Sequence, residues 1–514
     1  MKKTANIWIG SKRNSQTRWL PHLDMTWNPD KIKILGIWFT NDLKDMGEMN
    51  LNDKFYEIRT LFRIWLNRTS TPIGRSVILK SLILSKLIYL WILLPNPPEI
   101  LIQNLQKECF DFVWDKKRDK IKRTLSIHHY KEGGINVPHI SNYIKSLKLG
   151  WLKKTVREKQ PKWMHILKSK GFKTADMDTF GTRMFTNRFS NPFWKDVFNA
   201  YNDLDNKMKP KDADEFLAEP LFKNNKFKIA NETIHYEDWV TNHIFLVKHL
   251  LKDNGSFMTL QEFQGKYDFN PRPLEFFGCI SSIAKFKKAN KYNVETNETK
   301  TISRKNTLLF QQENGSRNIY NALIPQAEVP NAWKNWENLL EQNLNWNKTC
   351  KNLSKIKESK LKWFQMRICH RILVTNSILM NMGITENNTC NFCLNERDTV
   401  LHYLWKCVHV KMFWQDFERT LKNECAHCDR LSMNPILILF GNDGKNTTDD
   451  GFDFILLNAK YYVYKCRLNK TLPRMDVFKK DLNYVYNIDK HVHIIEMTLE
   501  KFHKKWQLYQ HLLL

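Results

Sequence analysis

The 514-residue sequence has no uninterrupted apolar run long enough to form a membrane span. Its most apolar stretch, Val77 to Leu94, contains Lys80 and Lys86 and stops at Pro95. Each lysine near the centre of a membrane span costs about 2.5–3.5 kcal/mol on insertion scales. The first ten residues also lack the apolar core of a signal peptide. We therefore expect a buried helix at 77–94, no membrane partner, and an intracellular protein of the cytoplasm, the nucleus or both.

Cysteine is scarce and scattered, since the chain has only ten cysteines. This number and spread exclude a disulfide framework and indicate a reducing compartment. Cys425 and Cys428 have CxxC spacing with His427 between them, but two further ligands are absent nearby, so we expect no second metal site. The remaining isolated cysteines are Cys109, Cys279, Cys350, Cys369 and Cys466.

Acidic residues are few relative to basic ones, with 53 Asp and Glu against 81 Lys and Arg and a net charge of +28. Such an excess favours a polyanionic partner, because each neutralised phosphate releases counterions. A basic protein without a particular partner remains the alternative. Aromatic residues make up 13% of the chain, so the protein is not a disordered basic tail. Its length predicts two to four domains.

Four metal-ligand side chains follow the spacing C-x2-C-x8-H-x4-C, at Cys390, Cys393, His402 and Cys407. Three thiolates and one imidazole suit a tetrahedral Zn²⁺ ion and leave no position open for water. The sequence therefore predicts a structural zinc site rather than a zinc hydrolase, whose HExxH-type pair is absent. The alternative is four unrelated core residues, since free cysteine is often buried.

Hydrophobic periodicity predicts a mainly α fold with minor β structure. Alternating segments at Ala5–Ile9 and Ile32–Phe39 are expected to be strands. Phe55, Ile58 and Trp65 recur at helical spacing. The expected divisions are short strands in 1–50, helices in 51–155, a mixed α/β connector in 156–350, a zinc-binding domain in 351–425 and a helical segment in 426–514.

Two basic segments are candidate nucleic-acid contacts. Six of the eight residues from Lys116 to Arg123 are basic and lie between Trp114 and a Gly-Gly turn. Basic and aromatic side chains together suit a phosphate backbone, although a charge run is commonly just a solvated surface. The candidates there are Lys116, Lys117, Arg118, Lys122 and Arg123. The second segment is an amphipathic helix expected from Ser354 to Val374, with Arg367 and Arg371 on one face.

The motifs together resemble the C-terminal half of a non-LTR (LINE-type) retrotransposon reverse transcriptase, and they occur in that family's order. Thr4–Arg13 and Ile32–Ile37 resemble the end of the palm and the primer grip. The string from Trp65 to Tyr89 resembles the thumb, which implies that Arg75, Lys80 and Lys86 approach phosphates. Leu361–Arg371 with the four ligands resembles the family's zinc-binding domain. Further matches are Phe112–Trp114 with Gly133–Ile135, Trp414 and Ala459–Tyr464.

The sequence departs from the family at the catalytic carboxylates. Polymerisation needs closely spaced carboxylates that hold two metal ions, and the family's aromatic-x-Asp-Asp motif is absent. The adjacent pair Asp449–Asp450 lies in a polar stretch and is expected to be a turn. We therefore expect no polymerisation by this chain alone, and Mg²⁺ only in a full-length family member. The resemblance implies RNA and DNA as partners, together with the missing catalytic half. A zinc-stabilised protein-interaction protein is the alternative.

Overall fold

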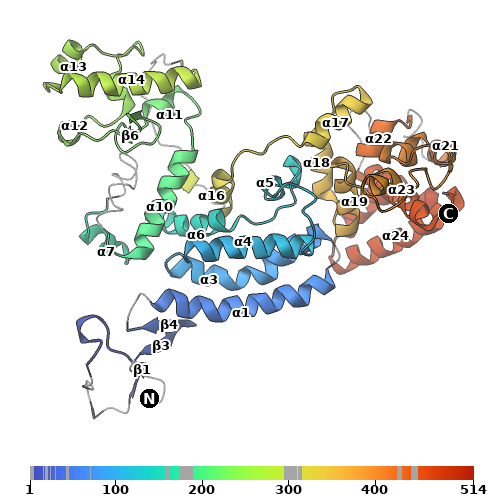
Figure 1. Ribbon diagram of the computed structural model, residues 1–514, viewed down its shortest axis with the longest axis horizontal. Coiled ribbons are helices and arrows are strands. Elements are labelled where there is room, and N and C mark those ends of the chain that lie inside the picture. Colours follow the sequence, from blue (N-terminus) through green and yellow to red (C-terminus); the bar gives the residue numbers. More distant parts are fainter. Residues whose placement is uncertain are drawn as a thin grey trace. The chain divides into compact units, whose positions relative to one another are not determined.

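The computed structural model (Figure 1) is mainly helical, with short two-stranded sheets, which confirms the predicted fold class. It describes residues 5–15, 17, 21–22, 25–28, 30–41, 45–69, 71–156, 161–173, 189–293, 309–310, 315–424, 431–441 and 450–513.

The chain divides into two compact units, each assembled from three separate segments. The first unit comprises Met1–Leu61, Leu82–Gln106 and His139–Pro325, and the second comprises Phe62–Ser81, Lys107–Pro138 and Gln326–Leu514. Two long helices, α1 (Asp45–Arg68) and α4 (Glu99–Trp114), contribute residues to both units. The five consecutive divisions expected from the sequence remain predictions.

The N-terminal strands lie in the first unit. Strand β1 (Ala5–Asn6) pairs in parallel with β2 (Thr26–Trp27), and β3 (Lys31–Ile34) pairs antiparallel with β4 (Ile37–Thr40). The single strand predicted over Ile32–Phe39 is therefore wrong. Leu35 and Gly36 have φ values of 49° and 85°, and two successive positive φ values form the tight turn that joins hairpin strands. The chain reverses at this turn rather than continuing as one strand.

The apolar stretch at 77–94 is two helices and not the single helix expected. Helix α2 (Pro72–Ile78) continues through the π-helical turn η2 (Leu79–Ile83), and α3 (Ser85–Leu93) follows with a bend of 49°. A π-helical turn inside an α-helix is a common cause of such a bend. Leu79, Ile83, Leu84 and Leu87 are fully buried. Within the described residues no single helix is long and apolar enough to cross a membrane, and this bent pair meets that test only when its halves are combined.

The rest of the first unit has two hydrophobic cores. One core, within residues 213–292, surrounds the fully buried Trp239, and the other joins α6, α10 and α16. The third small sheet of the described residues, β5 (Lys228–Ile229) with β6 (Glu232–Thr233), belongs to the same unit. The other elements of this unit are η1 (Gly10–Lys12), α6 (Ile140–Thr155), α7 (Met164–Ser169), α10 (Pro192–Lys207), α11 (Ala213–Leu217), α12 (Glu237–Thr241), η4 (Val247–Leu250), α13 (Leu260–Tyr267), α14 (Pro273–Asn290) and α16 (Gly315–Leu323).

The second unit contains the cysteine-rich segment within a group of packed helices. Helix α19 contacts α2, α22 and α23, and α23 in turn contacts α24 and α25. Its elements are α5 (Arg123–Ser126), η3 (Tyr130–Glu132), α17 (Asn331–Leu340), α18 (Trp346–Lys355), α19 (Ser359–Cys369), α20 (Asn376–Asn381), η5 (His402–Lys406), α21 (Val408–Glu424), α22 (Pro435–Phe440), α23 (Asp450–Asn469), α24 (Met475–Ile495), α25 (Leu499–Trp506) and η7 (Gln510–Leu513).

The amphipathic helix predicted from Ser354 to Val374 is shorter than expected. Ile356 and Glu358 have extended backbones, which separate α18 from α19. At the other end Arg371 has a φ of 54°, a left-handed conformation that ends helices. Residues 359–369 alone form the helix that carries Arg367, and Arg371 lies beyond it.

His370 joins two segments of the second unit that are far apart in the sequence. Its Nε2 lies 2.8 Å from the carbonyl oxygen of Gly133, and it donates this hydrogen bond when Nε2 carries the proton. Gly133 has a φ of 81°, and a side chain there would press on Pro330 and Trp333. Trp114 and Trp363, one from each of these two segments, are also in contact, with their ring centroids 5.9 Å apart. Burial lowers the pKa of His370 to about 4, so its imidazole is neutral near pH 7.

We expect His370 to make the second unit sensitive to acid. Its folded-state pKa of about 4 lies below the ordinary value of 6.5, so the unfolded chain binds more protons between these two values. Burial of the neutral imidazole is therefore compatible with full stability above about pH 6.5. Stability is lost as the pH falls from 6.5 toward the folded-state pKa of about 4. The free energy of unfolding should decrease between about pH 7 and pH 5, and in the His370→Gln variant this decrease should be smaller by about 2 kcal/mol.

The measurement is the urea-unfolding free energy of each variant at both pH values. His165→Gln, at an exposed histidine, is the control and should retain the pH dependence of the unsubstituted protein. Equal pH dependence in the His370→Gln variant and the unsubstituted chain would contradict the assignment.

Candidate metal centre and basic segments

The first two ligands lie on a tight knuckle. The backbone N–H of Cys390 donates to the carbonyl oxygen of Glu396 at 2.8 Å, and that of Leu394 donates back to Cys390 at 2.9 Å. Leu394 has a φ of 57°, which closes the turn after Cys393. The backbone N–H of Phe392 lies 3.4 Å from the sulfur of Cys390. These bonds hold the two thiols on one side of the loop.

The other two ligands lie at the two ends of one π-helical turn. His402 begins η5, and Cys407 directly follows it, at the start of α21. The backbone N–H of Cys407 donates to the carbonyl oxygen of His402 at 2.8 Å. Because the turn is wider than an α-helical one, it brings the imidazole and the third thiol to the same side.

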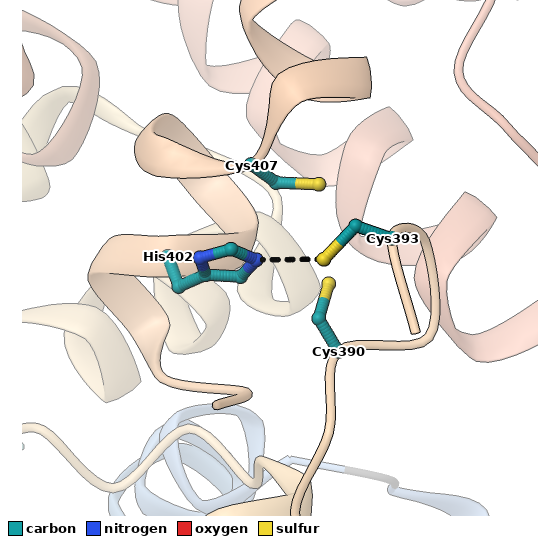
Figure 2. Close-up of side chains that lie close together, drawn as sticks. All are labelled: Cys390, Cys393, His402 and Cys407. Carbon is teal, nitrogen blue, oxygen red and sulfur yellow. Dashed lines mark hydrogen bonds between the residues drawn. The ribbon is translucent and has the colours of Figure 1, made fainter. Parts of the chain in front are cut away.

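The four ligand atoms converge on one point, as Figure 2 shows. They lie within 4.8 Å of one another, and the sulfur of Cys393 is 3.4 Å from Nε2 of His402. A tetrahedral ion with metal–sulfur bonds of about 2.3 Å requires sulfurs about 3.8 Å apart. Three of the four residues are buried, and Cys393 is half-buried. The cluster predicted from the spacing is therefore present and can hold one metal ion.

Glu396 supports the metal ligand His402. Its Oε2 lies 3.2 Å from Nδ1 of His402, which places a proton on Nδ1 and leaves Nε2 as the metal-facing atom. A carboxylate behind a ligating histidine fixes the ring and raises its basicity. Sequence reasoning missed this residue, although an acid between the second cysteine and the histidine was a usable signal.

The pKa values of the Cys390 and Cys407 thiols are shifted in opposite directions. The hydrogen bond with Cys407, together with burial, raises the pKa of Cys390. The same hydrogen bond lowers the pKa of Cys407, against the effect of burial. One proton shared between two close sulfurs accounts for both directions. A bound dication would replace that proton and allow both thiols to ionise.

A buried ion pair fastens this segment to helix α23. Asp398 and Arg467 form a two-point hydrogen-bonded pair, with side chains that are 0% and 4% exposed. Burial opposes the charge of Arg467, but Asp398 outweighs it, so the pKa of Arg467 is raised. Asp398 also accepts from the backbone N–H of Asn376 at 2.7 Å. The guanidinium lies 5.0 Å from the ring centroid of Tyr403.

Helix α23 connects the cysteine-rich segment with the preceding basic helix α19. Phe364 of α19 contacts Tyr461 and Tyr464 at ring separations of 5.2 Å. Arg467, which like Tyr461 and Tyr464 belongs to α23, forms a hydrogen bond with Asp398. Helix α23 therefore lies against both parts and joins them.

Arg75, expected to approach phosphates, has an internal role in this structure. It is 8% exposed and donates to the carbonyl oxygens of Thr69, Leu66 and Val113, at 3.0, 3.4 and 3.4 Å. Asp115 lies 3.7 Å away as its counter-charge. These partners occupy the guanidinium, so we remove Arg75 from the candidate phosphate contacts.

The other two thumb-like lysines are exposed but lie in different units. Lys80 is on η2 in the second unit, and Lys86 is on α3 in the first. Lys86 pairs with Glu57 at 3.2 Å. The structure leaves the phosphate role of both lysines as a prediction.

The predicted basic run is an exposed loop between α4 and α5. Asp115 and Lys116 have positive φ values of 59° and 55°, so the chain turns sharply after Trp114 and raises the basic residues away from the buried helix end. The exposed side chains are Lys116, Lys117, Arg118, Lys120, Lys122 and Arg123. We call residues 116–123 the basic loop.

Arg367 and Arg371 do not share one face. The guanidinium of Arg367 lies over Tyr464 at 5.3 Å, and its Nη1 donates to the hydroxyl of Tyr464 at 3.4 Å. Its buried Nε has no hydrogen-bond partner among the described residues. Arg371 lies over Trp336 at 5.0 Å and donates to the carbonyl oxygen of Asn335 at 3.1 Å. The prediction of a common basic stripe was wrong because the helix ends before Arg371. Arg371 alone of the two is exposed.

The remaining residues singled out in the sequence either are buried or lie outside the described residues, with Asp450 at the start of a helix. Tyr403 and Phe413, two aromatic residues near the cysteine-rich cluster, are buried core residues. Cys425, Cys428 and Asp449 lie outside the described residues, and Asp450 begins α23. No family model matches the chain.

Removal of one ligand should release the metal. Cys393→Ser leaves three donors, and the chain should lose one metal equivalent relative to the unsubstituted protein, as measured by elemental analysis. Because a structural ion supplies about 10–16 kcal/mol of apparent binding free energy to the local fold, proteolysis within 376–407 should also increase. Cys466→Ser, at a buried cysteine outside the cluster, is the control. Unchanged metal content in Cys393→Ser would refute the site.

Loss of the buried carboxylate should destabilise the second unit strongly. Asp398→Asn leaves Arg467 buried without its counter-charge, and the removal of one partner of a buried pair costs about 3–5 kcal/mol. Urea unfolding of the metal-loaded chain measures this change. The exposed pair Arg419–Asp416, at 3.2 Å, supplies the control Asp416→Asn, expected to change stability by about 0–1 kcal/mol. Similar effects of the two substitutions would contradict the role given to Asp398.

Proposed function

We propose that the protein binds nucleic acid through the basic loop of its second unit. The observation that carries the proposal is six exposed basic side chains within eight consecutive residues, in a chain of net charge +28. Phosphate contacts by lysine and arginine supply sequence-independent affinity. RNA and DNA are both candidate partners.

The charge of the basic loop is only partly neutralised within the protein. Lys117 pairs with Asp115 at 2.8 Å, and Arg123 pairs with Asp119 at 2.6 Å. Three further basic side chains form no ion pair with any described residue. These are Lys116, Arg118 and Lys120. They supply the positive charge that a phosphate backbone would meet.

The metal at the Cys390–Cys407 cluster is proposed to be Zn²⁺ in a structural role. Three thiolates and one imidazole are the donor set that this ion prefers, and four protein ligands leave no open position for a substrate. The cluster would stabilise the fold of residues 376–407, and through Asp398 its attachment to α23. The basic loop, rather than the metal, would contact the nucleic acid.

We further propose that the chain is the C-terminal part of a retrotransposon reverse transcriptase. The order of its motifs supports this origin, as does the convergence of the four ligands at the spacing of the zinc-binding domain. The catalytic half would then be a second partner and would supply the Mg²⁺-binding carboxylates. This chain would position template and primer without polymerising DNA.

A protein-interaction role for the same zinc-stabilised unit is the second candidate. Apolar side chains around the metal cluster are highly exposed, with Met382 at 65%, Ile384 at 67% and Leu394 at 74%. Exposed apolar groups of this size commonly mark contact surfaces. Binding of this kind would depend little on salt, which separates it from binding to phosphates.

The test of nucleic-acid binding is the salt dependence of affinity for a structured RNA. Combined substitution of Lys116, Arg118 and Lys120 by Glu should weaken binding. It should also lower the slope of log affinity against log salt by about 2–3, at about 0.7–0.9 for each lost phosphate contact. Fluorescence anisotropy over a salt series measures both quantities.

A matched control replaces three exposed lysines elsewhere in the second unit by Glu; these are Lys411, Lys480 and Lys490. This variant has the same net charge as the basic-loop variant and should keep most of the affinity and slope. Undetectable binding, salt-independent binding, or equal loss in both variants would refute the proposed role of the basic loop.

A further inference from the structure

The second unit contains a cavity that neither the metal cluster nor the basic loop explains. Its volume is about 1130 Å³, and its lining comes from α18, α19, α22, α23, α24 and α25. This volume is slightly above the range of about 300–1,000 Å³ that is usual for small-molecule sites. No metal ligand lines it.

The walls of the cavity are largely apolar. They include Leu353 of α18, Phe440 of α22, Leu457 of α23 and Ile488 of α24. Ile488 lines the cavity and is 48% exposed, so the cavity opens to solvent beside an apolar side chain. A ligand with an apolar body would bury that surface.

Lys460 of α23 is the buried charged group of the cavity. It is 3% exposed, and its Nζ donates to Oε1 of Gln365 at 2.5 Å and to the carbonyl oxygen of Leu439 at 3.4 Å. Both acceptors are neutral, and the ammonium forms no ion pair with any described residue. Burial lowers the pKa of Lys460 to about 8, so it still carries its charge near neutral pH. The carboxylate of Asp453 in the lining raises this pKa against the effect of burial. The two atoms that accept hydrogen bonds from Nζ are neutral, so an anion in the cavity would give the ammonium a directly bonded charged partner.

Apart from Lys460, the lining has five lysines and four carboxylates, so its excess of positive charge is small. These residues are Lys355, Lys357, Lys501, Lys504 and Lys505, and Glu358, Asp453, Asp489 and Glu496. Lys357 pairs with Glu496 at 2.5 Å, and Lys505 pairs with Asp489 at 2.9 Å. Within each pair the positive and negative charges cancel. Two exposed lysines of the lining, Lys501 and Lys504, form no ion pair with any described residue. They lie on the solvent side and would attract an anion toward the cavity.

We propose that this cavity binds a small organic anion, with its apolar body against the helix walls and its acidic group on Lys460. The acidic group is a carboxylate or a phosphate, because both accept charge-assisted hydrogen bonds from an ammonium. Asn352, which donates to Asp453 at 3.1 Å beside the cavity, and Gln365 offer polar contacts to the rest of the ligand. This site is independent of nucleic-acid binding by the basic loop.

Calorimetric titration of the metal-loaded full chain tests the proposal with two probes, adenosine 5′-monophosphate and decanoate. We expect at least one probe to bind. Lys460→Gln keeps a hydrogen-bond donor but removes the charge, and it should weaken binding about tenfold or more, which corresponds to about 1.4 kcal/mol. Lys480→Gln, an exposed lysine of α24 outside the cavity, is the matched control and should bind as the unsubstituted chain does.

The double substitution Lys501→Glu with Lys504→Glu provides a second test at exposed positions. It should weaken the same probe by repulsion, and it decides the outcome if Lys460→Gln does not fold. Binding of the nucleotide alone identifies a phosphate ligand, binding of decanoate alone identifies a carboxylate ligand, and either result supports the site. Absence of binding by both probes, or equal affinity in the unsubstituted chain and both cavity variants, would overturn it. Neither overturning result affects RNA binding by the basic loop.

Discussion

The convergence of four ligand atoms within 4.8 Å is the constraint on which the second unit depends. The segment 376–407 contains one short α-helix and one π-helical turn, too little regular structure to bury a large core. A bound cation would balance the charge of the three thiolates and hold these four groups together. With that centre formed, Asp398 lies inside the protein, where it meets Arg467.

Polar contacts between distant segments then set the arrangement of the surrounding helices. Asp398 binds Arg467, Gln365 binds Lys460, and His370 binds the carbonyl group of Gly133. Each of these groups is buried, so each would be costly without its partner. Such contacts add modest net stability, but they penalise any other arrangement of the helices. The apolar faces of α19 and α23 supply the larger favourable term.

This arrangement changes which basic residues are available to a polyanion. Arg75 was expected to contact phosphate from the family resemblance, and Arg367 from helical periodicity. The first is buried and the second lies against Tyr464. The basic loop keeps its charge on the surface because the sharp turn after Trp114 lifts it from the end of α4. The metal cluster stabilises the fold, the basic loop carries surface charge, and the cavity around Lys460 is a third, separate feature.

The sequence by itself determined the mainly helical class and the four residues of the candidate metal cluster. Helical periodicity and ligand spacing are local patterns, and a short segment contains all the information they need. The hairpin at Leu35–Gly36 and the end of α19 before Arg371 were missed, because they depend on positive φ values at Leu35 and Arg371, which are residue types that seldom adopt them. Only the tertiary structure decided that Glu396 supports His402 and that Arg467 partners Asp398. It alone also showed Lys460 buried beside a cavity. Burial and pairing of a charge depend on side chains that are far away in the sequence, and composition and spacing carry no record of them.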